Sequence, residues 1–195
     1  MLSKRIEPNL KPNPMFSFMG RALANAYHEI DNPGGVISLG IAENMLVSTE
    51  LADFLNKNMK ITPNLFGYNA SSPGLPSLFE GLLKLYNNDP FNPAVPVTTD
   101  HIYISSGCTS LLDQFSWTLC NEGDGVLIGK PCYGGFVPDM TGRSKVTPVL
   151  VSLKGIDPFS TKAVERFEEE LVLAEKRGIK VRVLVLSNPH NPLGQ

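Results

Sequence analysis

The fold is decided by residues 149–186, which read VLVSLKGIDPFSTKAVERFEEELVLAEKRGIKVRVLVL. Strands are predicted at Val149–Leu153 and Val181–Leu186, because short runs rich in β-branched residues favour buried strands. Between them, Thr161–Lys176 is predicted to form a long helix, and its apolar residues recur at helical spacing. Two strands joined by such a helix are typical of a parallel sheet.

The same alternation begins further upstream. Strands are predicted at His101–Ser105 and Val126–Gly129, a helix at Leu111–Leu119 and a short helix at Phe136–Met140. The predicted fold class is therefore α/β: an incomplete three-layer sandwich with a mostly parallel sheet, covered by helices on both faces.

The first third of the chain has a different composition. Residues 1–19 contain three prolines among polar residues, which predicts an extended arm, and a short helix is predicted at Arg21–Glu29. Two further helices are predicted to begin at Ser48, which we expect to cap its helix, and at Pro76. We expect residues 1–36 to form the arm and short helix, and residues 37–195 to form the globular part.

Composition excludes several classes of partner. The chain has 195 residues, 42% of them hydrophobic, and a formal net charge of −2, which predicts one globular unit. Without a basic field we expect no binding of nucleic acid or of an anionic membrane, so any phosphate must be bound locally.

The three cysteines fit neither a disulfide framework nor a zinc site. No apolar run approaches the ~18 residues of a membrane span, so the expected location is the cytoplasm.

A candidate anion site lies in residues 104–110, ISSGCTS. This stretch joins a predicted strand to the start of a predicted helix, where free backbone N–H groups and the helix dipole favour an anion. Gly107 would let a ligand approach the backbone, and nearby hydroxyl groups would add uncharged donors. Small residues at such a junction also commonly serve only to cap the helix, and that interpretation stays open.

Two more loops follow predicted strands. Tyr133 lies after the strand at Val126–Gly129 and could stack on a flat heteroaromatic ring, or could simply cover the sheet edge. Asn191 lies between Pro189 and Pro192, which restrict the backbone and so fix the direction of the Asn191 amide. The amide could therefore bind a ligand, or Asn191 could simply be one of the residues that form the turn. Together the three loops offer what a planar phosphorylated cofactor requires.

Several motifs carry a resemblance to a known family. They are GVISLGIAEN at 35–44, Tyr68 followed by GLP at 74–76, SGCT at 106–109, PCY at 131–133 and SNPHNPLG at 187–194. In these residues the chain resembles fold-type I pyridoxal-phosphate enzymes. Within them it is similar to the class I/II aminotransferases close to plant and fungal 1-aminocyclopropane-1-carboxylate synthases.

The resemblance implies a role for each matching residue. Backbone amides of Cys108 and Thr109, with the Thr109 hydroxyl, would bind the phosphate of pyridoxal phosphate. Tyr133 would stack on the pyridine ring, and Asn191 would hydrogen-bond its phenolic oxygen. Tyr68 would reach the phosphate bound by a partner subunit in a homodimer.

The resemblance also places Ala42 and Glu43 near the amino-acid end of the substrate. Residues 71–73 look like an insertion next to Tyr68, and an insertion there would affect whether the Tyr68 side chain reaches the phosphate bound by the partner subunit.

The family's Schiff-base lysine, ring-nitrogen aspartate and substrate arginine lie beyond the motif at 187–194. We therefore expect the chain to be the truncated front part of the large domain, with negligible turnover alone, because the base and the electron sink would be missing. One alternative is a non-enzymatic remnant that associates with a partner through the dimer surface. Another is an independent α/β protein that binds a phosphorylated ligand.

Overall fold

The computed structural model describes residues 2–4, 6–10, 14–68 and 74–195. The chain divides into two compact units, Met1–Glu80 and Gly81–Gln195, and each is described here by itself. The predicted boundary between residues 36 and 37 stays a prediction.

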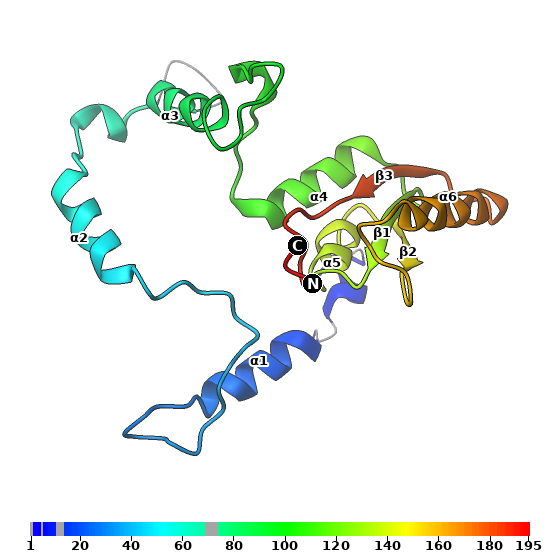
Figure 1. The fold of residues 1–195 in the computed structure, drawn as a ribbon, viewed down its shortest axis with the longest axis horizontal. Coiled ribbons are helices and arrows are strands. Elements are labelled where there is room, and N and C mark those ends of the chain that lie inside the picture. Colours follow the sequence, from blue (N-terminus) through cyan, green and yellow to red (C-terminus); the bar gives the residue numbers. More distant parts are fainter. Residues whose placement is uncertain (1, 5, 11–13, 69–73) are drawn as a thin grey trace. The chain divides into compact units, whose positions relative to one another are not determined.

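The first unit contains short helices. They are the 3-10 helices η1 (Glu7–Leu10) and η2 (Pro63–Phe66), the helices α1 (Pro14–Ala24) and α2 (Ser48–Asn58), and the start of α3 (Pro76–Tyr86) (Figure 1). The helix predicted at Arg21–Glu29 was placed too late, and residues 14–19 are helical rather than extended. Proline is tolerated at the first helical position, so Pro14 starts α1 instead of excluding it.

Helix α2 confirms the predicted helix but not its cap. It begins at Ser48, whose hydroxyl donates to the Met45 carbonyl oxygen at 3.0 Å and makes no capping bond. Its apolar stripe, Leu51, Phe54 and Leu55, is exposed, with Phe54 at 62%. Within its unit, α2 therefore presents an apolar face that the described residues leave uncovered.

The second unit is built on a three-stranded sheet. Strands β1 (Gly125–Lys130), β2 (Thr147–Ser152) and β3 (Val181–Val185) lie in the order β2-β1-β3, and all pairs are parallel. In the β1–β2 pair, Gly125 lies opposite Thr147 and Lys130 opposite Ser152. The β1–β3 pairing shifts register after Gly125.

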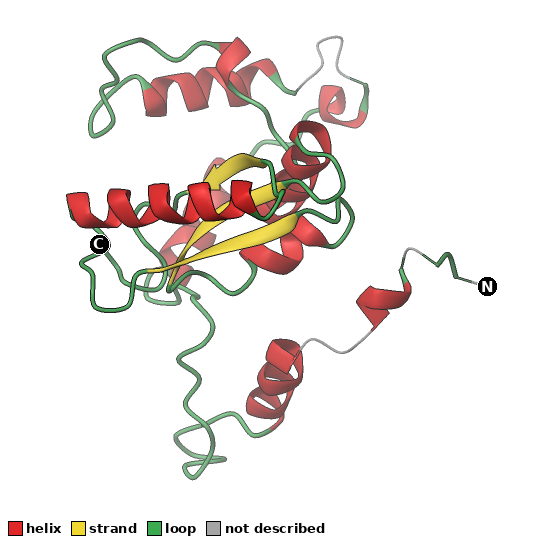
Figure 2. Cartoon of the chain, turned by 90° about the vertical axis from the view of Figure 1, so that its right-hand side faces the viewer, coloured by secondary structure: helices red, strands yellow, loops and turns green. Residues whose placement is uncertain are grey.

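Helices cover both faces of this sheet (Figures 1 and 2). Helix α6 (Thr161–Lys176) covers one face and packs on Leu127 and Val151 through side chains such as Phe167. Helices α4 (Gly107–Leu119) and α5 (Phe136–Thr141) contribute to the cluster on the other face, around Val126 and Ile128. The alternation of side chains along β1 thus serves two separate cores, and the predicted three-layer α/β class is confirmed.

The bounds of most predicted elements in this unit agree with the structure within two or three residues at their ends, although α4 begins four residues earlier than predicted. The strand predicted at His101–Ser105 is wrong: a 3-10 helix, η3 (Thr99–His101), precedes a segment without regular structure. A strand requires a paired neighbour, and among the described residues none pairs with 102–105. Among the described helices, none has the length and apolarity required to cross a membrane.

Candidate functional site

The first part of the candidate site is the amino end of α4. Gly107 has φ +81°, and a Cβ atom built on it would meet nothing within 4 Å. Its own N–H donates to the Ser105 carbonyl oxygen at 2.9 Å. The preceding residue, Ser106, makes no side-chain capping bond. The N–H groups of Cys108 and Thr109, in the first helical turn, therefore have neither an intrahelical acceptor nor a side-chain cap among the described residues.

A hydrogen-bonded set of side chains joins the two ends of this loop. Gln114 Nε2 lies 2.8 Å from Ser105 Oγ and 2.8 Å from Ser110 Oγ, and the two serine oxygens lie 2.9 Å apart. Tyr103 donates its hydroxyl to Gln114 Oε1 at 2.9 Å. The loop is thus anchored before and after Gly107.

Helix α4 is also tied to α5 and to the residues that follow it. Thr109 donates its hydroxyl to Asp139 Oδ2 at 3.1 Å. Arg143 pairs with Asp113 at 2.8 Å, and its guanidinium lies 4.7 Å from the centre of the Trp117 ring. The first turn of α4 is therefore fixed next to α5, and a carboxylate lies beside the predicted phosphate contact.

Tyr133 lies in the loop between β1 and α5. Its carbonyl oxygen accepts from the Phe136 N–H at 3.2 Å, and the two rings meet edge to face at 5.4 Å. A Cβ atom on Gly135 would overlap the Tyr133 ring, so a side chain at that position would require the ring to shift. Tyr133 as a whole residue is 41% exposed, so part of its surface is available for stacking.

Asn191 lies in the turn that follows β3. Its N–H lies 3.4 Å from Ser187 Oγ, and the Gly194 N–H donates to the His190 carbonyl oxygen. The His190 ring meets the Phe159 ring edge to face at 6.0 Å. Because β1 and β3 are neighbouring parallel strands, the loops that carry Tyr133 and Asn191 leave the same edge of the sheet.

The structure thus connects three of the predicted cofactor residues through α5. Thr109 bonds to Asp139 on that helix, Cys108 adjoins Thr109 in α4, and Tyr133 lies three residues before the start of α5. Asn191 follows the adjacent strand, and among the described residues no hydrogen bond joins it to the other three.

The other predicted site residues belong to the first unit. Tyr68 is fully exposed there, and Ala42 and Glu43 are exposed in a segment without regular structure. Their roles stay predictions. The insertion predicted at residues 71–73 lies outside the described residues.

This arrangement fits a planar phosphorylated cofactor in its donor chemistry. Two free N–H groups at a helix amino end, with open space above Gly107, suit a phosphate. An exposed aromatic face and an amide suit a heteroaromatic ring bearing a phenolic oxygen. Asp139 is the exception, because Thr109 cannot donate one hydrogen to that carboxylate and to a phosphate at the same time.

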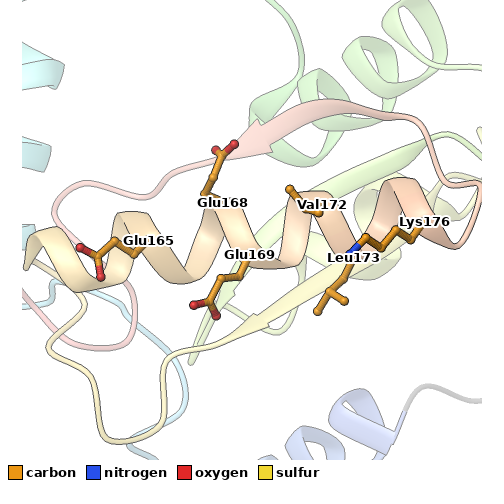
Figure 3. A pocket seen from close by; sticks show the side chains of 6 residues that line it. All are labelled: Glu165, Glu168, Glu169, Val172, Leu173 and Lys176. Carbon is orange, nitrogen blue, oxygen red and sulfur yellow. The ribbon is translucent and has the colours of Figure 1, made fainter.

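Other surfaces of the described chain are less suited to a ligand. A hollow on the outer face of α6 is lined by one helical stripe, shown in Figure 3, that comprises Glu165, Glu168, Glu169, Val172, Leu173 and Lys176. All six side chains come from one element, so no groups from separate loops converge there. Among the described residues, no three His, Cys, Asp or Glu side chains gather to hold a metal.

Sequence reasoning missed Gln114 and Asp139. Gln114 follows Ser110 by four residues, and that helical spacing is a signal that could have revealed the pair. Asp139 meets Thr109 across 30 residues of chain, and no local pattern indicates such a contact.

The chain is similar to known aminotransferases over most of its length. A family model described as aminotransferase class I and II matches residues 36–195. The aminotransferase verI of Clonostachys rogersoniana is 32% identical over 161 residues, which cover 81% of this chain and 37% of that protein. The 1-aminocyclopropane-1-carboxylate synthase of Malus domestica is 31% identical over 189 residues, covering 87% of this chain and 37% of that protein.

A mouse protein named "Probable inactive 1-aminocyclopropane-1-carboxylate synthase-like protein 2" is 32% identical over 178 residues, which cover 88% of this chain and 30% of that protein. This chain therefore spans less than half the length of these relatives.

Solved structures show the same fold. A kynurenine aminotransferase from Pyrococcus horikoshii superposes with a TM-score of 0.66 at 19% identity, over 94% of this chain and 42% of that chain. A single mutant of Thermus thermophilus aspartate aminotransferase gives a TM-score of 0.60 at 22% identity, over 98% of this chain and 46% of that chain. With the family match over residues 36–195, these findings show that the chain belongs to the class I and II aminotransferases.

Proposed function

We propose that this protein binds pyridoxal phosphate and serves an aminotransferase or 1-aminocyclopropane-1-carboxylate synthase-like reaction of amino acids. The observation that carries the proposal is the amino end of α4, where the N–H groups of Cys108 and Thr109 lie beside the open position at Gly107. Phosphate groups bind at such helix ends because free donors and the helix dipole act together.

Each residue of the site has a separate task in this proposal. Cys108 and Thr109 bind the phosphate through backbone N–H groups, and Tyr133 covers one face of the ring. Asn191 donates its amide to the phenolic oxygen of the ring. When bound, the cofactor supplies an electron sink for chemistry at the amino-acid Cα atom.

We further propose that residues 1–195 alone bind the cofactor without turning over substrate. The donors described above hold a phosphate and a ring, and none of them is a base for the Cα proton. General acid–base catalysis contributes about 10²–10⁴-fold, so without a positioned base we expect turnover to fall by at least that factor. Lys130, at the end of β1, is exposed, and we assign it no catalytic task.

A second candidate is a non-enzymatic protein that assembles with a partner subunit. Two observations favour it: the name of the mouse relative describes it as "probable inactive", and α2 leaves Leu51 and Phe54 exposed within its unit. Exposed apolar stripes of this kind often mark interaction surfaces.

We also propose an oligomeric state and a cellular location for the protein. We propose a homodimer in which Tyr68 completes the partner's phosphate site and Ala42 and Glu43 line the substrate end. The free thiols of Cys108, Cys120 and Cys132 support a reducing compartment such as the cytoplasm.

The test is to titrate the purified protein with pyridoxal phosphate and then reduce it with borohydride. Saturable binding, with no single lysine modified above the surface background, is the expected result. Stoichiometric reduction onto one lysine of this chain would contradict the predicted lack of turnover. Failure to bind, together with a stable complex with a full-length relative, would favour the second candidate.

A further inference from the structure

Gln114 lies about one and a half turns beyond the proposed phosphate contacts on α4, and it touches both ends of the loop that carries them. Its amide nitrogen lies 2.8 Å from Ser105 Oγ, before the loop, and 2.8 Å from Ser110 Oγ, after it. An amide nitrogen has two hydrogens, so both contacts can be made at once.

The carbonyl end of the same side chain is fixed too. Tyr103 donates its hydroxyl to Gln114 Oε1 at 2.9 Å, which prevents the amide from rotating freely. The two serine oxygens lie 2.9 Å apart, so one hydroxyl donates to the other. We call these four side chains, Tyr103, Ser105, Ser110 and Gln114, the serine–glutamine clasp. Within the clasp, one serine hydroxyl hydrogen is left over as a donor.

Inside the clasp, the loop is held by the Gly107 N–H bond to the Ser105 carbonyl oxygen and by the Thr109 bond to Asp139. Gly107 is in the left-handed region at φ +81°, and the space where its side chain would lie is empty to 4 Å. Glycine adopts many conformations, so this geometry is not fixed by local sterics. The Cys108 and Thr109 N–H groups lie in the first turn of α4, so their position relative to the preceding segment depends on the clasp together with the Thr109–Asp139 bond.

We infer that Gln114 is a positioning residue of the phosphate site, an inference that rests on the function proposed above. It touches no ligand itself. It holds the two ends of the loop at one spacing, so that the Cys108 and Thr109 N–H groups point at the phosphate before it arrives. Preorganised donors bind more tightly because less conformational freedom is lost on binding.

The test compares two ligands that differ only in the phosphate. Pyridoxamine 5′-phosphate and pyridoxamine both lack the aldehyde, so neither reacts with surface lysines. Binding of each to the full chain is measured by calorimetry, and the ratio of the two affinities reports the phosphate contacts alone. We expect the unaltered chain to prefer the phosphorylated ligand by at least about tenfold.

Gln114→Met keeps the length and helix propensity of the side chain but removes its hydrogen bonds. It is expected to reduce the preference by about five- to tenfold, the effect of losing one or two hydrogen bonds. Tyr103→Phe, which releases only the carbonyl end, is expected to reduce it about two- to threefold. Thr118→Ala, at an exposed position on the same helix, is the matched control and should leave the ratio unchanged.

The outcomes separate the inference from the function on which it rests. A preference in the unaltered chain that survives in Gln114→Met would overturn the positioning role and leave the proposed function standing. An equal loss for both ligands would show a merely structural role and would overturn it as well. No preference in the unaltered chain would refute the proposed phosphate site itself. If Gln114→Met does not fold, the result from Tyr103→Phe decides.

Discussion

Asp139→Asn is expected to strengthen phosphate binding at the amino end of α4. The carboxylate of Asp139 now accepts the hydroxyl hydrogen of Thr109 at 3.1 Å. A bound phosphate competes for that hydrogen and is also repelled by the carboxylate charge. Asparagine retains an oxygen that can accept from Thr109 and removes only the charge.

The size of the effect follows from the geometry. A phosphate oxygen within hydrogen-bond distance of the Thr109 hydroxyl would lie about 5 Å from the Asp139 carboxylate. Two unit charges at that separation repel by about 0.8 kcal/mol in water and by about 3 kcal/mol at an effective dielectric constant of about 20. Asp139 is half-buried, so we take a value near the lower end. About 1 kcal/mol corresponds to roughly fivefold tighter binding.

The assay is calorimetric titration with pyridoxamine 5′-phosphate at low and high salt. Salt screens exposed charges, so the gain should shrink at 1 M salt, where the Debye length is about 3 Å. Glu122→Gln is the matched control, because it removes the same charge at the opposite end of β1, where Glu122 pairs with Lys145. Weaker binding by Asp139→Asn, or an equal gain in the control, would refute the reasoning.

Two further predictions test the fold and the site. Gly129→Ala should lower the free energy of unfolding, measured in urea, by about 1–3 kcal/mol, because the new Cβ atom would lie 2.9 Å from Phe167 Cζ. Gly134→Ala is the control and should be nearly neutral, because its Cβ atom would point into open space. Iodoacetamide should modify exposed Cys108 before Cys132, because burial raises the pKa of Cys132 and so lowers the fraction of its thiol that is thiolate. Raising the pH should increase that fraction and reduce the difference between the two rates. Pyridoxamine 5′-phosphate should slow the reaction of Cys108 alone. Equal protection of both thiols, seen by peptide mass spectrometry, would argue against a ligand at α4.

The elements that the sequence predicts well are those whose signal is local. The helix predicted at Thr161–Lys176 has the same bounds in the structure, and Gly178 follows it with φ +77°, as a helix end of this type requires. Gly125–Lys130 contains a short apolar run that is buried on both faces, and Val181–Val185 is a β-branched run whose residues alternate between half-buried and exposed.

The errors concern properties that depend on distant residues. Ile102–Ile104 alternate in the manner of a strand, but no described residue pairs with them. For the site, the amino end of α4 was predictable because small residues between a loop and a helix are a local pattern. The contact between Thr109 and Asp139 was not, because it depends on how α4 and α5 pack.

Because the side chains of β1 point alternately into two cores, the effect of an inserted residue depends on where in the chain it is inserted. An extra residue within 125–130 would exchange the faces of Leu127 and Ile128 and also shift the loop of Tyr133 by one residue against β3. An extra residue in the exposed turn at 154–155 would change neither the cores nor the spacing of the ligand-facing loops. Length variation among natural or engineered variants should therefore collect in such turns, while β1 keeps a constant number of residues.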